Sequence, residues 1–307
     1  MAEKGLFSFA LMCALTVQGV AVAEQGHVQE PAHETTAEPA HSEPAEHVAI
    51  SDAALIEQHM ALAMSTEKAG YGPQSPRDID APHGDNTRNF GLAPPFAKMN
   101  LCDIHFHENA EHRGGEFTKY VGNGDGYGFG TGFKYSGELT AQELTPLGHA
   151  IGVSEHGDLQ SGDTIEVHYV FSTAQAAPGP TLGTCLSEAI NNPNLRVEAQ
   201  VYVLVNDQNA LDFRDLTRIE TVRGLYQATG IPTNTGTPVV YNGSTTGPTY
   251  NVKGSPFQVT WSVRPRVARV NIASVGAWLE DNVFEEDHAH GVRNLVIDPA
   301  LLSEIER

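Results

Sequence analysis

The chain has 307 residues, enough for one large domain or two small ones with an ample hydrophobic core. Its 38 acidic and 18 basic residues give a formal net charge of −20 at pH 7. This charge excludes nucleic acid or an anionic membrane surface as a partner, and it disfavours polyanionic substrates. A small neutral substrate is compatible with it.

The first residues have the pattern of a secretory signal. Lys4 precedes the apolar run GLFSFALMCALTVQGVAVA, which ends in Ala21-Val22-Ala23, an A-x-A cleavage pattern. The run is too short to span a membrane comfortably, and polar sequence follows at once. We therefore predict a cleaved signal peptide at residues 1–23. The mature protein is expected to be periplasmic or secreted, with no membrane insertion.

Export determines how the cysteines are interpreted. Cys13 lies in the signal, which leaves Cys102 and Cys185 in the mature chain. In an oxidising compartment such a pair most simply forms one disulfide, and the alternative is two buried free thiols. A bridge that closes so long a loop adds roughly 4–5 kcal/mol of stability in the chain-entropy model.

Residues 24–70 are acidic and rich in Glu, Pro, Ala and His, with no Lys or Arg between Lys4 and Lys68. This composition cannot bury enough apolar surface to fold, so we predict a disordered segment. Near its end, SDAALIEQHMALAMSTEK predicts a short helix capped by Ser51. Four histidines recur in the segment and indicate weak metal capture, and the alternative is a solvated spacer; they are His27, His33, His41 and His47.

The remainder, residues 71–307, is typical of an all-β protein from about residue 90 onward. RVEAQVYVLVND, DTIEVHYVFS, FQVTWSV and RVARVNIAS are rich in β-branched and aromatic residues. Clusters of Gly, Asn, Pro and Ser separate them. The best helical pattern is the short SVGAWLEDNVF. We predict a single mainly β domain with a central, largely antiparallel twisted sheet and few short helices.

Histidines on two predicted strands indicate a metal site. In DIHFHENAEH, residues 103–112, strand alternation places His105 and His107 on one face. In TIEVHYVF, Glu166 and His168 likewise share a face. Three neutral nitrogens from these strands form the open catalytic arrangement for Zn²⁺, and Glu166 is placed to fix an imidazole tautomer. The alternative is that these histidines are ordinary core or surface residues.

Several stretches together resemble the delta-class carbonic anhydrases, over roughly residues 72–297. They are LCDIHFHENAEHRGGEF, GDTIEVHYVFS, PGPTLGTCLSE, LRVEAQVYVLVND and VTWSVRPRVARVNIASVGAW followed by NVFEEDHAHGVRNLV. The site is also similar to that of alpha-class carbonic anhydrases, with HFH, then a Glu-His pair, then ExH. QSPRDID at 74–80 and GSTTGP at 243–248 look like alpha-class segments too. The resemblance implies an alpha-carbonic-anhydrase-like fold.

The resemblance also implies a zinc enzyme that hydrates CO₂ reversibly to bicarbonate and a proton through a zinc-bound hydroxide. The three histidines would bind one Zn²⁺, and Co²⁺ or Cd²⁺ could occupy the same ligands. Because neutral ligands leave zinc its full charge, the pKa of bound water can fall from 15.7 to about 7. Glu111 would orient a gatekeeper threonine, for which Thr245 is our choice and Thr246 the neighbour.

Turnover requires a proton to leave for the buffer, and a histidine with an ordinary pKa near 6.5 suits that task. We take His112 as the candidate shuttle, although the sequence does not choose between it and three other histidines. These are His83, His149 and His156, and all four candidates are expected on loops. His288 and His290 form a second HxH pattern without an evident distant partner, which we interpret as structural or as a rim contact.

Two other functions stay open. A zinc-binding or scavenging envelope protein would use the His-rich segment and take up metal without hydratase activity. Storage, however, does not require Glu111 and a Thr-Thr loop beside three histidines. A cupin would use His105, His107 and Glu111 as iron or manganese ligands. Its second motif needs a glycine-proline turn shortly before the histidine, whereas His168 follows GDTIEV in mid-strand.

Overall fold

A computed structural model describes residues 48–88 and 90–306. The predicted signal peptide at residues 1–23 lies outside the described residues. So does the greater part of the acidic segment, including its four recurring histidines. Across the described ranges, no helix is both long enough and apolar enough to cross a membrane.

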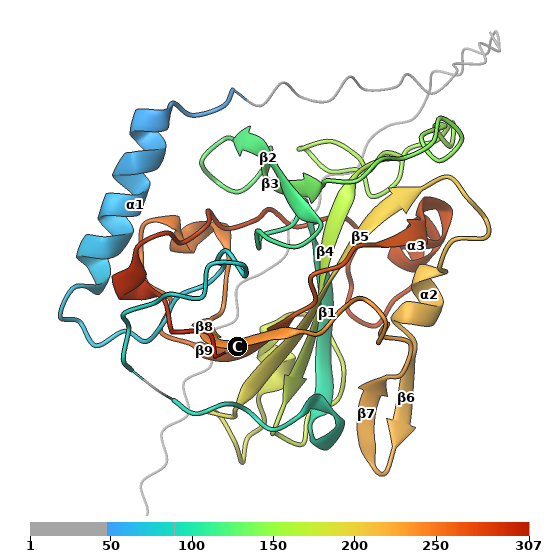
Figure 1. Ribbon diagram of the computed structural model, residues 1–307. Helices are drawn as coiled ribbons and strands as arrows, with labels where there is room; N and C mark the ends of the chain where they lie inside the picture. The colour runs from blue at the N-terminus through green and yellow to red at the C-terminus, as the bar shows by residue number, and fades with distance from the viewer. Residues whose placement is uncertain (1–47, 89, 307) are drawn as a thin grey trace, which may run out of the picture. The chain divides into compact units, whose positions relative to one another are not determined.

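Ten strands and a few helices make up the described chain (Figure 1). The strands are β1 (Asn100–Glu108), β2 (Phe117–Asn123), β3 (Thr131–Tyr135), β4 (Thr164–Ser172), β5 (Leu195–Val205), β6 (Ile219–Val222), β7 (Leu225–Ala228), β8 (Val239–Ser244), β9 (Gln258–Val263) and β10 (Ala268–Asn271). The α-helices are α1 (Asp52–Thr66), α2 (Phe213–Leu216) and α3 (Ile272–Glu280). Four 3₁₀ turns complete the set: η1 (Phe96–Lys98), η2 (Leu182–Cys185), η3 (Pro248–Asn251) and η4 (Pro299–Leu301). The prediction of a mainly β protein with few helices is confirmed.

One sheet dominates, with strand order β1-β4-β5-β9-β8 and with β10 also paired to β5. The pairs β1–β4, β4–β5 and β8–β9 are antiparallel, while β5–β9 and β5–β10 are parallel. The sheet is therefore mixed, with the antiparallel pairs in the majority. The pairs β2–β3 and β6–β7 form separate antiparallel hairpins.

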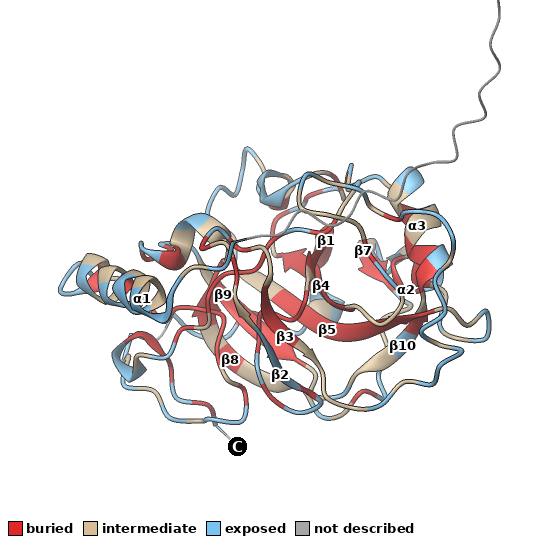
Figure 2. Cartoon of the chain, turned by 90° about the horizontal axis from the view of Figure 1, so that it is seen from above, coloured by how far each residue is buried: buried red, intermediate tan, exposed pale blue. Residues whose placement is uncertain are grey.

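Both faces of the central strands are covered, and every residue of β4 is buried (Figure 2). Ile165, Val167, Tyr169 and Phe171 face one apolar cluster, which also contains side chains from α2 and α3. The other face carries Glu166, His168 and Val170, and Val170 joins a second apolar cluster. A strand that is buried on both faces can hold polar side chains only where partners satisfy them. The alternation predicted for this strand is confirmed.

The helices follow their sequence signals. α1 begins after Ser51, whose hydroxyl accepts a hydrogen bond from the amide of Ala54, as the capping prediction requires. Leu62 of this helix packs in a buried cluster with Val296, Leu301 and Leu302. The structure thus places the helix with the folded body rather than in the spacer before residue 71. α3 contains the first part of SVGAWLEDNVF, so a helix there is also confirmed.

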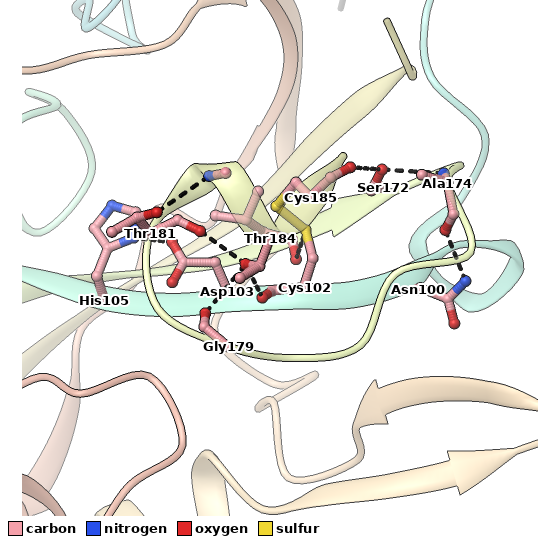
Figure 3. Close-up of a disulfide and its surroundings, with 12 residues drawn as sticks. Asn100, Cys102, Asp103, His105, Ser172, Ala174, Gly179, Thr181, Thr184 and Cys185 are labelled. Atoms are coloured by element: carbon pink, nitrogen blue, oxygen red, sulfur yellow. Dashed lines mark hydrogen bonds and ion pairs between the residues drawn. A yellow bond between two sulfur atoms is a disulfide. The ribbon is translucent and has the colours of Figure 1, made fainter. Parts of the chain in front are cut away.

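Cys102 of β1 and Cys185 of η2 form a disulfide (Figure 3). The predicted bridge is therefore present. It joins the first strand of the sheet to the loop that follows β4.

Candidate metal centre

Adjacent strands bring three histidines together. His105 of β1 and His168 of β4 are directly paired across the antiparallel ladder, and His107 lies two residues further along β1. One ring nitrogen from each lies within 4.8 Å of the others. The Nε2 atom of His105 lies 3.3 Å from Nδ1 of His168. A tetrahedral zinc ion with Zn–N bonds of about 2.0–2.1 Å holds its nitrogens roughly 3.3–3.4 Å apart, so this spacing fits zinc.

The second ring nitrogen of each histidine contacts a fixed oxygen. His105 Nδ1 donates to Asp103 Oδ2 at 2.7 Å, His107 Nδ1 to the carbonyl oxygen of Gly291 at 2.8 Å, and His168 Nε2 to Glu166 Oε1 at 3.0 Å. Carboxylate and carbonyl oxygens are acceptors, so the proton of each neutral ring lies on the nitrogen that faces them. The remaining nitrogen of each ring keeps its lone pair and points at the other two. This is the arrangement that orients histidine ligands around a metal.

Burial keeps these rings suited to metal binding. It lowers the pKa of His168 to about 4 and the pKa of His107 well below its ordinary value. For His105, burial is again the largest influence and acts in the same direction, but the charge and hydrogen bond of Asp103, together with the charges of Glu286 and Glu111, outweigh it and raise the pKa. The Nε2 atom of His107 is buried and has no hydrogen-bond partner among the described residues. A buried nitrogen without a partner is costly, and a metal ion at this point would satisfy it.

Glu111 lies beside the triad and is 1 % exposed. Its Oε1 accepts a hydrogen bond from the backbone amide of Arg293 at 3.0 Å, and its Oε2 has no partner in the described part of the chain. Burial raises the pKa of this carboxyl group. A free carboxylate oxygen next to a candidate metal site is a natural acceptor for a hydroxyl group.

The expected contact between Glu111 and Thr245 is not formed in this structure. The hydroxyl of Thr245 lies 2.6 Å from the hydroxyl of Ser255 instead. Thr245 directly follows β8, and its amide donates to the carbonyl oxygen of Phe257, which holds it beside the 255–257 segment. Thr245 and Thr246 both line the cavity at the triad, but neither bonds Glu111.

His112 lies on the bend that follows β1, as expected, but it does not face solvent. His112 is 0 % exposed, its Nδ1 donates to Glu166 at 2.6 Å and its Nε2 lies 2.7 Å from the hydroxyl of Tyr241. Its backbone amide donates to the second oxygen of Glu166. A buried carboxylate needs such charge-assisted donors, and they lower the pKa of Glu166 well below its ordinary value although burial acts in the opposite direction. His112 therefore supports the site and has no route to solvent.

His112, Glu166 and His168 form a second close group of possible ligand atoms. The hydrogen bonds from both imidazoles to Glu166 account for this group without a metal. Neither His112 nor Glu166 lines the cavity. The group at His105, His107 and His168 is therefore the better metal site.

A cavity of about 370 Å³ opens beside the triad. Val170, Val197, Val259 and Trp261 form an apolar wall next to the histidines. Three polar side chains also line the cavity, Glu286, His288 and His290, and of the two interpretations of the second HxH pattern this favours the rim contact. The sequence showed the HxH pattern of His288 and His290. It could not show that the fold places these two residues beside the triad.

The other histidines considered as shuttles do not line this cavity. His83 is paired with Asp85 and Glu304 at the surface, and His149 lines a separate cavity beside α3. His156 stacks on Phe129, with ring centres 3.4 Å apart, and Phe129 forms part of the cavity wall. The structure thus brings a different pair of histidines to the mouth.

A family model described as Delta carbonic anhydrase matches residues 96–274, more than half of the chain. The chain belongs to the delta carbonic anhydrase family. The predicted resemblance to this family is confirmed, and the chain is a carbonic anhydrase by family. The matched residues include all three histidines of the triad, whereas His288 and His290 follow the matched region.

Solved structures similar to this delta-family chain include alpha-carbonic anhydrases. That of Thermovibrio ammonificans, in complex with sulfanilamide, shares 16 % identity over 73 % of this chain and 84 % of its own, with a TM-score of 0.26. That of Photobacterium profundum shares 17 % identity over 78 % and 92 %, with a TM-score of 0.26. A hyperthermostable carbonic anhydrase from a hydrothermal vent chimney shares 14 % identity over 76 % and 86 %, also at 0.26. No curated protein matches the chain.

Proposed function

We propose that the chain binds one Zn²⁺ through His105, His107 and His168 and catalyses the reversible hydration of CO₂ to bicarbonate and a proton. The observation that carries this proposal is the triad itself: three converging ring nitrogens, each turned by an acceptor on its other nitrogen. When bound, zinc supplies a Lewis acid that makes water a nucleophile near neutral pH. Co²⁺ or Cd²⁺ would suit the same donors.

The cavity wall supports a small neutral substrate. Val170, Val197 and Trp261 are all at least 96 % buried and lie beside His168 in the cavity. CO₂ has no charge and no hydrogen-bond donor, so an apolar surface binds it without an unsatisfied polar group. The strongly negative charge of the chain does not repel it. We infer that CO₂ lies against this wall while the histidine face of the cavity holds the metal.

Glu111 is proposed as the acceptor that orders hydrogen bonds at the site. Its Oε2 is buried without a described partner, and such an oxygen needs a donor. Thr245 remains the proposed donor because it lines the cavity at the triad, and Glu111 lies beside His107 and His168 of that triad. That role requires the hydroxyl to exchange Ser255 for Glu111, since the Ser255 contact is the one formed in this structure.

His288 is proposed as the residue that carries the product proton to the buffer, in place of His112. It lines the cavity, and its side chain is 42 % exposed. Its Nδ1 contacts Asp287, which leaves Nε2 to accept a proton and release it to solvent. His290 lies between His288 and the triad, with ring centres 6.2 Å from His288 and 5.5 Å from His105.

We also propose that the protein acts in the periplasm or outside the cell. The disulfide supports this location, because disulfides persist in oxidising compartments. There the enzyme would supply bicarbonate or balance pH.

The proposed function is tested by stopped-flow CO₂ hydration with the chain from residue 24 onward, with zinc measured in the same sample. The control is His168→Ala. Hydration with about one zinc per chain, both lost in the variant, is the expected result. One bound zinc without hydration above the buffer rate would overturn catalysis and favour the scavenger. Bound iron or manganese in place of zinc would favour the cupin.

A further inference from the structure

A β-bulge in β1 places two neighbouring side chains on the same face of the sheet. Leu101 pairs with Phe171 and Asp103 pairs with Val170, so Cys102 is the extra residue. Leu101 and Ile104 both face the cluster that contains α2 and α3. Cys102 and Asp103, between them, therefore both point to the opposite face, which carries the candidate metal centre.

Cys102 is fixed to the wall of the cavity. Its disulfide partner Cys185 ends η2 (Figure 3), and Leu182 at the start of η2 lines the cavity. The carbonyl oxygen of Cys102 accepts from the amide of Gly179 at 3.1 Å and from the hydroxyl of Thr184 at 2.9 Å. The disulfide and these two hydrogen bonds clamp β1 at the residue that precedes Asp103.

The carboxylate of Asp103 has few hydrogen bonds to hold it in place. It is 1 % exposed, and its Oδ2 lies 2.7 Å from His105 Nδ1. Its Oδ1 is buried without a hydrogen-bond partner among the described residues. A buried carboxylate with so few donors tends to move toward water unless its backbone is fixed. The pairing of Asp103 with Val170 supplies part of that restraint, and the clamp at Cys102 adds to it at the bulge.

We propose that the Cys102–Cys185 disulfide positions Asp103 against His105 and thereby tightens the binding of the metal. The inference rests on the proposed zinc site and extends it, because it makes Asp103 a positioning residue and the disulfide part of the site. Loss of an acceptor behind a histidine ligand typically weakens metal binding about 10–100-fold. Reduction of the disulfide is expected to have an effect of that size.

Coupling between two sites is reciprocal. If the disulfide tightens zinc binding by a given factor, bound zinc makes the folded protein resist reduction of the disulfide by the same factor. The redox equilibrium of the disulfide therefore reports the coupling without any measurement of activity.

The experiment equilibrates the chain with glutathione redox buffers, with and without zinc held at a fixed free concentration by a competing chelator. Because reduction of the disulfide consumes two GSH and forms one GSSG, the quotient [GSH]²/[GSSG] at half reduction is measured by thiol trapping and mass spectrometry. Saturating zinc is expected to raise it about 10–100-fold in the wild type. In Asp103→Asn, zinc should hardly change this quantity, because the amide does not carry the charge that holds His105.

Glu198→Gln is the matched control. Glu198 is 3 % exposed and pairs with Tyr169, which faces the side of the sheet away from the metal centre. In this variant, zinc should shift the redox equilibrium of the disulfide as much as it does in the wild type. The same factor in wild type and Asp103→Asn would overturn the proposal, since zinc would then act by stabilising the whole fold.

Direct metal binding gives the second measurement. Zinc affinity of oxidised wild type is compared with that of Cys102→Ala/Cys185→Ala by chelator competition. The double variant is expected to bind about 10–100-fold more weakly, and adding Asp103→Asn to it should change little further. Equal affinity in folded wild type and double variant would refute the coupling. Failure of the oxidised wild type to bind zinc at all would instead refute the proposed function.

Discussion

The chain contains the His-x-His pattern twice, and the two copies have opposite surroundings. His105 and His107 lie on β1, with side chains 17 % and 5 % exposed. His288 and His290 lie on the irregular segment after α3, with side chains 42 % and 47 % exposed. Spacing alone therefore does not distinguish a ligand pair from a rim pair, whereas backbone regularity and burial do.

The two pairs are also neighbours. The amide of His290 donates to the carbonyl oxygen of Phe106, and the amide of Glu108 donates to the carbonyl oxygen of His290. These bonds attach the second pair alongside β1. Each inner ring offers one nitrogen close to the ligand nitrogens of the other triad histidines, while the outer rings contact the carboxylates of Asp287 and Glu286. The inner pair belongs to the proposed zinc site, and the outer pair belongs to the proposed route of the proton to solvent.

The largest difference should appear when one histidine of each pair is removed. His107→Ala is expected to lose zinc and, with it, CO₂ hydration. Removal of a residue that only hydrogen-bonds a metal ligand weakens metal binding roughly 10–100-fold, and removal of the ligand itself should weaken zinc binding more than that. His290→Ala should retain about one zinc per chain. Metal content after dialysis against a weak chelator distinguishes them. Zinc loss in both variants would remove the distinction between the pairs.

Glu111→Gln tests whether the inner region does more than bind metal. An amide cannot act as a pure acceptor toward a hydroxyl group, so the order of donors and acceptors at the site is disturbed. We expect kcat to fall about 100–1,000-fold, the range seen when one preorganised hydrogen bond of an active site is lost. Zinc content should be unchanged. Wild-type kcat in this variant would exclude Glu111 from the mechanism.

The sequence predicted the features that depend on local pattern. Alternation on β4 placed Ile165 and His168 on opposite faces, and a capping residue marked the start of α1. The disulfide followed from having two cysteines in a chain whose export the sequence predicts. Each of these inferences needed only neighbouring residues or a count.

Features that depend on distant contacts were not predictable. His112 looked like a loop histidine, yet it is buried because Glu166, 54 residues away, needs a donor. Thr245 was matched by motif, but Ser255 lies closer to its hydroxyl than Glu111 does. The bulge that turns Cys102 and Asp103 to one face is a property of strand pairing and leaves no mark in the sequence. His290 reaches the site only through its backbone contacts with β1.

The pH dependence of stability gives the next largest effect. Burial lowers the pKa of His168 to about 4 in the folded, metal-free protein, against about 6.5 in an unfolded chain. Between these values the unfolded state binds more protons, so the free energy of unfolding falls as pH falls from 6.5 to 4. The full decrease is on the order of 3 kcal/mol, since each pKa unit corresponds to about 1.4 kcal/mol. Below pH 4 this contribution levels off.

Urea unfolding of metal-free protein across this pH range measures that decrease. His168→Asn should flatten the curve relative to wild type, because the variant has no imidazole to protonate. His288→Asn, at a half-exposed position, should follow the wild-type curve. An unchanged slope in His168→Asn would show that another buried group sets the acid sensitivity of the fold.

The smallest expected effect is that of the outer pair on turnover. His288→Ala should lower kcat about tenfold or more in dilute buffer, because proton transfer by a positioned side chain is lost. Imidazole at high concentration should restore kcat, since it accepts the proton directly, and zinc content should not change. His149→Ala, an exposed histidine outside the cavity, is the matched control and should keep wild-type kcat. A loss in His288→Ala that persists at every buffer concentration would mean that the outer pair shapes the site rather than carrying protons, and the contrast between the two pairs would then be one of burial alone.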